Sequence, residues 1–153
     1  MFYEPTTLAS ITGLLAISLQ EEYGIDPAPL FEQVGMSVTP VASPQLRYPF
    51  SKICKLWELS KKATGDDTIG LKTGAYAQPA HFYALGYSIS ASSTLLGALR
   101  RIVRYQKLVS TASWEIKITE TVDSFALVAE FPDESRSPPK EGIDCGMTAL
   151  LAL

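Results

Sequence analysis

The chain has 153 residues, of which 46% are hydrophobic and 19% charged, and its formal net charge at pH 7 is −3. A chain of this length fits one domain that buries roughly two thirds of the surface exposed by its unfolded form. The acidic balance lacks the clustered Lys and Arg of a nucleic-acid interface. No apolar run approaches the ~20 residues of a membrane crossing, and no signal peptide opens the chain. These features exclude a DNA- or RNA-binding segment and predict a soluble, cytoplasmic domain.

The first third of the chain predicts helices that are separated by glycine and proline. A first helix, capped by Thr6 or Thr7 and ended by Gly24, carries apolar residues at helical spacing. A short helix then follows the stretch "DPAP" and stops at Gly35. An extended connection comes next, marked by Pro40, Pro44 and Pro49.

Three further helices are predicted before residue 90. The first begins after Pro49, ends near Gly65 and buries one face. Its buried positions are Phe50, Ile53, Leu56, Trp57 and Ser60. Asp66 or Asp67 caps a second, short segment that ends near Gly74, and a third covers residues 81–89.

The stretch "SSTLLGALRRIVRYQKLVS" predicts an amphipathic helix that begins at a Ser/Thr cap formed by Ser92, Ser93 or Thr94. The expected buried stripe consists of Leu95, Leu99, Ile102, Val103 and Leu108. The opposite, solvent-facing side carries Arg100, Arg104 and Lys107. A solvated face outweighs a nucleic-acid patch because the rest of the chain is acidic and supplies no row of aromatic residues for stacking. A role in docking a partner stays open.

The apolar period then changes from 3.6 residues to 2, which indicates a β-hairpin. One strand carries Trp114, Ile116 and Ile118, and the other carries Phe125, Leu127, Ala129 and Phe131. A hairpin needs a helical layer on its apolar face, so we expect an α+β fold that is mainly helical, with an antiparallel β-hairpin packed on the helices. A Pro-rich, charged loop and a last apolar helix follow. That helix ends on "TALLAL" without a cap, and we expect the parent protein to continue beyond it.

No catalytic or metal-binding constellation stands out, and no cofactor is predicted. His81 has no Cys or acidic residue at ligand spacing. The stretch "GYSIS" (86–90) lacks the second glycine of a nucleophile elbow, and "GLKTG" (70–74) lacks the second half of a phosphate-binding loop. Cys54 and Cys145 are 91 positions apart with no CxxC pattern, which favours buried thiols over a disulfide or a metal site.

Three stretches carry a family resemblance: "GIDPAPLFEQVGM" (24–36), "RYPFSKICKLWELSKKATGDDTIGLKTG" (47–74) and "LGYSISASSTLLGALRRIVRYQKLVS" (85–110). Together they resemble the N-terminal, arabinose-binding-type effector domain of AraC-family bacterial transcription regulators. The matching positions are Arg47, Pro49, Gly65, Asp66, Gly70, Leu71, Leu85, Gly86, Tyr87, Thr94, Leu95, Ala98, Leu99, Arg104, Tyr105 and Leu108. Asp67 departs from the family, which commonly has proline there. The matched glycines and Tyr87 predict tight packing between short helices.

The resemblance implies that residues 1–153 form a non-enzymatic sensing and dimerisation domain. A C-terminal pair of helix-turn-helix motifs would bind DNA in the parent protein, and this pair is absent from the 153 residues. The implied partners are a small-molecule effector of unknown identity and a second copy of the chain, with no membrane association. The family name does not establish arabinose as the ligand. A stand-alone small enzyme and a purely protein-binding module stay open as alternatives.

Three aromatic residues are the candidate ligand-binding set. Tyr87, Tyr105 and Trp114 are expected to converge between helix and hairpin, in a cleft that holds the metabolite. Aromatic rings that carry one polar atom are a usual lining of small-molecule clefts. Ordinary core packing at the α/β interface explains the same residues equally well.

Overall fold

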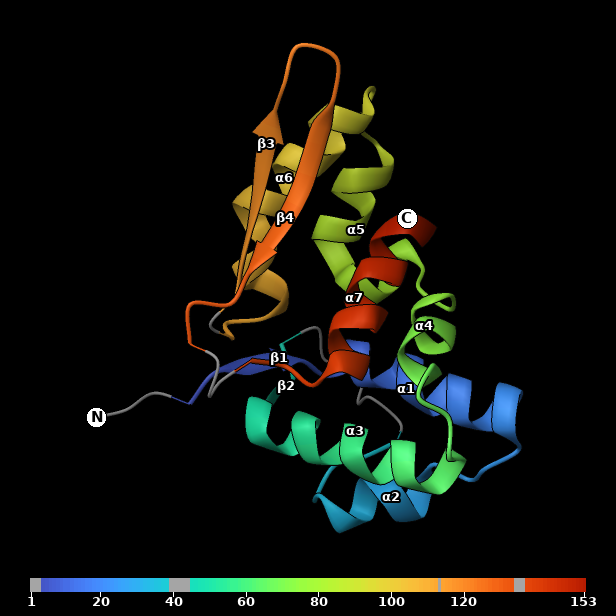
Figure 1. The fold of residues 1–153 in the computed structure, drawn as a ribbon. Coiled ribbons are helices and arrows are strands. Elements are labelled where there is room, and N and C mark those ends of the chain that lie inside the picture. Colours follow the sequence, from blue (N-terminus) through green and yellow to red (C-terminus); the bar gives the residue numbers. More distant parts are fainter. Residues whose placement is uncertain (1–3, 39–44, 113, 134–136) are drawn as a thin grey trace.

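The structure is a computed structural model that describes residues 4–38, 45–112, 114–133 and 137–153. It is an α+β fold, mainly helical, with an antiparallel hairpin packed on helices, as predicted (Figure 1). The helices are α1 (Ala9–Tyr23), α2 (Ala28–Gln33), α3 (Phe50–Thr64), α4 (Ile69–Gly74), the 3-10 helix η1 (Pro79–Phe82), α5 (Tyr83–Ser90), α6 (Leu95–Val109) and α7 (Lys140–Ala152). The strands are β1 (Thr6–Leu8), β2 (Arg47–Pro49), β3 (Glu115–Glu120) and β4 (Phe125–Glu130). Pro40 and Pro44 lie outside the described residues.

Most predicted helix ends are confirmed. Gly24 ends α1 and Gly65 ends α3, both in the left-handed conformation with φ of 62° and 64°. Thr94 caps α6, where its hydroxyl accepts a hydrogen bond of 3.0 Å from the Gly97 N–H. At α4 the cap position belongs to Thr68, and Asp66 instead accepts the Thr68 N–H at 2.7 Å in the preceding turn.

The predicted cap of the first helix is wrong, because Thr6 and Thr7 lie in strand β1. This strand pairs antiparallel with β2, with Thr6 opposite Pro49, and Leu8 takes the cap position of α1 without a side-chain hydrogen bond. The Thr7 hydroxyl bonds the Ser110 hydroxyl at 2.9 Å and is therefore engaged elsewhere. Threonine suits a strand as well as a cap, and the distant partner strand decides between them.

The Arg47 guanidinium fastens three segments that are far apart in the sequence. It donates to the Thr6 hydroxyl at 2.8 Å and to the Thr6 carbonyl at 3.1 Å. It also donates to the carbonyls of Leu108, at 2.8 Å, and Val109, at 3.3 Å, at the end of α6. These bonds hold the β1–β2 pair against the end of α6.

The hairpin packs on α6 along a stripe that is shorter than predicted. Ala98 and Ile102 are buried against β3, and Leu99 and Val103 are partly buried beside them. Leu95 is 67% exposed and Leu108 is 57% exposed, so these two predictions are wrong. Both leucines lie near an end of the helix, beyond the residues that pack into this core. The predicted solvent-facing positions are exposed, namely Arg100, Arg104 and Lys107.

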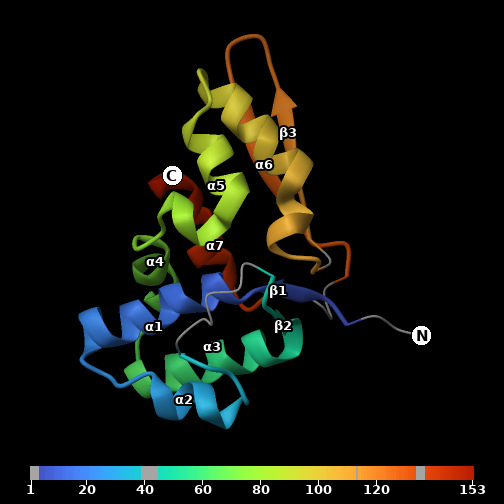
Figure 2. The ribbon, with the colours of Figure 1, turned by 180° about the vertical axis from the view of Figure 1, so that it is seen from behind.

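Helix α7 is the element that joins the core. In both views α7 lies between the part formed by α1, α2 and α3 and the part formed by α5, α6 and the hairpin (Figure 1, Figure 2). Cys145 packs into the core cluster formed with α1, α2 and α3, and Ala149 into a small cluster with Leu14 of α1. Leu150 and Leu153 pack against the core cluster formed by α5, α6 and β3. Each of the three core clusters therefore includes a contact from the last 14 residues of the chain (140–153).

Two glycines of α4 let α7 approach its backbone closely. A methyl group on Gly70 would lie 2.2 Å from the Glu141 carbonyl oxygen, and one on Gly74 would lie 2.6 Å from that of Cys145. In the same way Gly86 of α5 lies against the Pro79 carbonyl. The glycines of "GLKTG" are thus packing residues. The tight packing predicted for the matched glycines is confirmed at Gly70 and Gly86 but is wrong at Gly65, where an added methyl group would have no neighbour within 4 Å.

Candidate functional site

A cavity of about 140 Å³ lies where α7 meets α1, α3, α5, α6 and β3. Its position matches the predicted cleft between hairpin and helices. Apolar side chains from every one of these elements line it, among them Leu14, Ile89, Ile102, Ile116 and Ala149. A mainly apolar, partly open space at a junction of elements is a usual setting of a small-molecule site.

The described lining contains no charged side chain, and its hydroxyl and amide side chains are paired within the protein. Thr7 and Ser110 bond each other through their hydroxyls, and the Ser110 hydroxyl also accepts the Ala112 N–H at 3.2 Å. Gln106 donates from Nε2 to the Ile116 carbonyl at 3.2 Å and accepts the Ile116 N–H at 2.9 Å through Oε1. Gln106 thus imitates a neighbouring strand and anchors β3 to α6.

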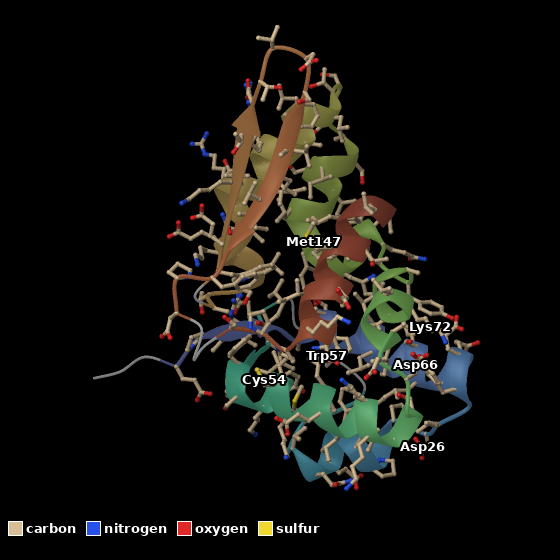
Figure 3. The ribbon with its side chains drawn as sticks, viewed as in Figure 1. Asp26, Cys54, Trp57, Asp66, Lys72 and Met147 are labelled. Atoms are coloured by element: carbon tan, nitrogen blue, oxygen red, sulfur yellow. The ribbon has the colours of Figure 1, made fainter. Side chains whose placement is uncertain are left out.

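Two tryptophans and two glycines form the side of the cavity next to α7. Trp57 of α3 lies beneath the first turn of α7 (Figure 3), and a methyl group on Gly142 would lie 3.4 Å from its Nε1. A methyl group on Gly146 would lie 3.8 Å from the Trp114 ring. Glycines four residues apart share one face of a helix, so α7 makes room for both indoles and for the space between them.

Cys145 is a buried free cysteine in the lining of the cavity. Its thiol is buried beside the cavity, and burial raises its pKa to about 12. The thiol is therefore neutral at physiological pH and acts as a small apolar group rather than as a nucleophile. Cys54 is half-buried, and burial, followed by the nearby Glu58 carboxylate, raises its pKa as well.

The family model that describes the N-terminal arabinose-binding domain of AraC transcription regulators matches residues 24–153. The chain belongs to this family. No curated protein sequence matches this arabinose-binding-type domain. Family membership makes it a ligand-sensing regulatory domain, and no helix in the described part of the chain is long and apolar enough to cross a membrane.

In this arabinose-binding-type domain, only one of the three aromatic residues that were expected to converge belongs to the lining of the cavity. Trp114 lines the cavity, whereas neither Tyr87, 61% exposed on α5, nor Tyr105, 40% exposed on α6, belongs to the lining. The Tyr105 ring faces Arg104, whose guanidinium carbon lies 5.4 Å from the ring centre. Tight packing of Tyr87 was therefore a wrong expectation, and ligand contact by any of the three stays a prediction.

Sequence reasoning placed Trp57 and Ile102 in the core but did not connect them with a site. Gly142, Gly146 and Gln106 were not noticed at all. A glycine pair at a spacing of four in a helix otherwise rich in good helix formers was the available signal. For Gln106, a polar residue on the buried side of an amphipathic helix was the equivalent signal.

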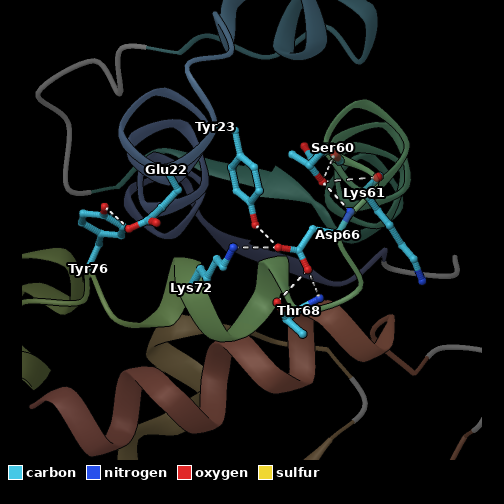
Figure 4. A network of polar contacts seen from close by, with 9 residues as sticks. Glu22, Tyr23, Ser60, Lys61, Asp66, Thr68, Lys72 and Tyr76 are labelled. Carbon is cyan, nitrogen blue, oxygen red and sulfur yellow. Dashed lines mark hydrogen bonds and ion pairs between the residues drawn. The ribbon is translucent and has the colours of Figure 1, made fainter.

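A polar network lies apart from the cavity and ties α1 to α4 (Figure 4). Asp66 accepts hydrogen bonds from Lys72 at 2.8 Å and from the Tyr23 hydroxyl at 2.9 Å, besides those from Thr68. These bonds, that from Lys72 first, hold the pKa of Asp66 well below its ordinary value. The carboxylate is therefore ionised and structural.

A second ion pair fastens the start of α7 to the end of α3. Lys61 lies 2.8 Å from both Glu141, whose side chain is 7% exposed, and Asp67, whose side chain is 78% exposed. Burial alone would raise the pKa of Glu141, but the hydrogen bond and charge of Lys61 outweigh it and the pKa is lowered. The hydrogen bond to Asp67 first, and that to Glu141 second, raise the pKa of Lys61. The buried carboxylate is thus charged and neutralised by its partner.

The other candidate groups have local structural roles. The ring of His81 accepts the Gln78 N–H at Nδ1 in a capping box at the start of η1. Among the residues that the structure describes, no three His, Cys, Asp or Glu side chains gather closely enough to hold a metal ion. The basic face of α6 is engaged locally, with Arg100 on Glu120 and Lys107 on the carbonyls of Ala112 and Trp114.

Proposed function

We propose that this chain senses a small-molecule effector in the cavity beneath α7 and transmits its presence to the rest of an AraC-type transcription regulator. The observation that carries the proposal is the position of the cavity. It is walled by α7, the helix that contacts all three core clusters, together with elements from both halves of the fold. A ligand in this space changes the packing of α7, so that binding has a route to other parts of the protein.

The remaining parts of the proposal follow from the family. The domain works in the cytoplasm as a homodimer, and a pair of helix-turn-helix motifs elsewhere in the same regulator binds DNA. Regulators of this type recognise paired DNA half-sites, and paired half-sites favour a dimer with two-fold symmetry. The domain itself performs no catalysis and needs no cofactor. Sedimentation of the full-length regulator as a monomer throughout the micromolar range would contradict the dimer.

A thermal-shift screen of the 153-residue chain tests the sensing function. The screen covers amino acids, small carboxylates, fatty acids, sugars and small aromatic compounds. A true effector raises the melting temperature in a dose-dependent way, because it binds the folded state and not the unfolded one. The rise should be smaller at the same ligand concentration in Gly146→Ala, which places a methyl group in the cavity wall at an ordinary contact distance of 3.8 Å from Trp114.

Other outcomes point to the alternatives. Hits that are unaffected by Gly146→Ala would place binding elsewhere on the domain. A screen with no hits, together with capture of the domain by a protein partner that is mapped to α6, would favour the protein-binding module. Turnover of any hit by the purified chain would favour an enzyme. A coding sequence without a basic pair of helix-turn-helix motifs downstream of Leu153 would remove the DNA-binding part of the proposal.

A further inference from the structure

We propose that the cavity takes a compact, uncharged, mainly apolar ligand with a hydrogen-bond acceptor at one end, and that Gly142 and Gly146 set the upper limit of its size. This inference rests on the proposed sensing function and names the chemical class of the effector. It differs from the sugar that the family name suggests.

Charge complementarity argues against ionic ligands. The described lining has no Lys, Arg, His, Asp or Glu side chain. Among the described residues the one buried charged side chain is that of Glu141, and its carboxylate is already neutralised by Lys61 at 2.8 Å. A carboxylate or ammonium group would lose its hydration in this space without gaining a partner of opposite charge. Amino acids and small carboxylates are therefore disfavoured.

Hydrogen-bond accounting argues against sugars. Every hydroxyl of a pentose needs a partner once it leaves water, since an unpaired buried polar group is costly. The polar side chains of the lining that make such bonds well are Thr7, Gln106 and Ser110, and all three are already committed to protein partners. A polyol would have to break protein hydrogen bonds, such as those between Gln106 and Ile116, to find partners for its hydroxyl groups.

The indoles supply what the other polar groups do not. Trp57 and Trp114 both line the cavity, and within the described residues neither indole N–H makes a hydrogen bond or counts among the fully buried polar atoms without a partner, so both remain open to a ligand or to water. An indole N–H is a donor only, and tryptophan usually finds a partner for it when buried. A ligand with one carbonyl, ester or ether oxygen provides that partner while its apolar part fills the remaining space.

The volume suits a ligand whose buried part is about the size of one ring. An engineered apolar cavity of about 150 Å³ stays dry and binds benzene, and the cavity beneath α7 measures about 140 Å³. A methyl group fits without a clash at Gly146 and at ordinary contact distance at Gly142, 3.8 Å and 3.4 Å from the two indoles. Alanine at either position is thus tolerated by the fold but occupies space that a ligand needs.

Calorimetric or thermal-shift titration with four probes tests the inference on the wild-type chain. Methyl benzoate combines ring, acceptor and neutrality, toluene lacks the acceptor, benzoate carries the charge, and L-arabinose is the polyol. We expect methyl benzoate to bind most tightly, toluene more weakly, and benzoate and arabinose not at all. Gly142→Ala and Gly146→Ala should each weaken methyl benzoate roughly tenfold, the usual scale for one methyl group in an apolar pocket, without lowering the melting temperature.

Matched variants separate the acceptor from the ring. Trp57→Phe and Trp114→Phe keep an aromatic ring and remove one N–H each, so at least one should abolish the preference of methyl benzoate over toluene. Tyr105→Phe removes a polar atom from an aromatic residue outside the cavity and should change nothing. If both tryptophan variants still prefer methyl benzoate over toluene, the proposed hydrogen bond from an indole N–H to the ligand's acceptor would be wrong.

The outcomes also distinguish this inference from the sensing function. Saturable binding of benzoate or arabinose that is weakened by Gly146→Ala would overturn the ligand class and leave the cavity as the sensing site. Equal binding of all neutral probes to wild type and to both glycine variants would overturn the size limit. If none of the four probes binds and the broad screen is also empty, the ligand class and the sensing function fail together.

Discussion

Replacing Gly70 by alanine is expected to destabilise the domain, although alanine is the better helix former. The new methyl group would lie 2.2 Å from the Glu141 carbonyl oxygen and 2.8 Å and 2.9 Å from the carbonyl carbon and Cα of the same residue. All three neighbours are backbone atoms, which cannot rotate away as a side chain does. Real contacts of this kind stay above 3.0 Å, so α4 and α7 must separate by close to 1 Å.

The magnitude follows from two opposing effects. Forcing an extra methyl group into a well-packed contact costs about 1–3 kcal/mol, and removing glycine from a helix returns at most about 1 kcal/mol. Because the obstacle is rigid, we expect a net loss of about 2 kcal/mol, which lowers the melting temperature of a domain of this size by about 4–8 °C. Gly146→Ala is the matched control, since its methyl group meets only the Trp114 ring at 3.8 Å.

Urea unfolding followed by tryptophan fluorescence measures both variants, because Trp57 and Trp114 both lie against α7. Gly70→Ala should unfold at lower urea concentration than wild type, and Gly146→Ala at equal or higher concentration. A Gly70→Ala protein as stable as wild type would refute the close helix contact. Loss of stability in Gly146→Ala alone would show that the wrong face of α7 had been assigned to the cavity.

Three further predictions concern charge, capping and the strand anchor. In wild type the lowered pKa of Glu141 gives stability that is present above the unfolded-state pKa and is lost as the pH falls. In Lys61→Met burial dominates and raises the pKa of Glu141, so the deficit in melting temperature relative to wild type should grow from pH 4 to pH 7. A deficit independent of pH would contradict the pairing of Lys61 with Glu141. Thr94→Ala should cost about 1 kcal/mol in urea unfolding by removing the cap of α6, whereas Ser93→Ala should be neutral, and equal effects would contradict the assigned cap. Gln106→Leu leaves the N–H and carbonyl of Ile116 without partners and should cost about 1–3 kcal/mol, while faster hydrogen exchange at the Ile116 amide, seen by NMR, checks that the loss arises at β3.

Local signals in the sequence predicted local structure well. Gly24 and Gly65 end their helices because a left-handed residue is needed there, and the hairpin follows the change of period from 3.6 to 2. These features depend on residues within a few positions of one another. The pairing of β1 with β2 was missed because its partners, such as Thr6 and Pro49, are brought together only by the packing of the helices between them.

The site was harder to predict because it depends on which faces of distant helices meet. Tyr105 and Trp114 are close in sequence, but the direction of a side chain on α6 is set by helix phase, and Tyr105 points away from the core. The wall of the cavity combines Trp57 of α3 with Gly142 of α7, 85 positions later. Nothing in the local sequence of either residue indicates that contact.

The position of α7 also matters while the chain is being made. Helices α4 and α5 leave the ribosome well before residues 140–153, at a typical rate of 5–20 residues per second. Until then the seat formed by Gly70 and Gly74 is empty, and apolar side chains of all three core clusters face water. The contacts between α4 and α7 therefore form late, and their long sequence separation makes them slower to form than the local contacts within each short helix.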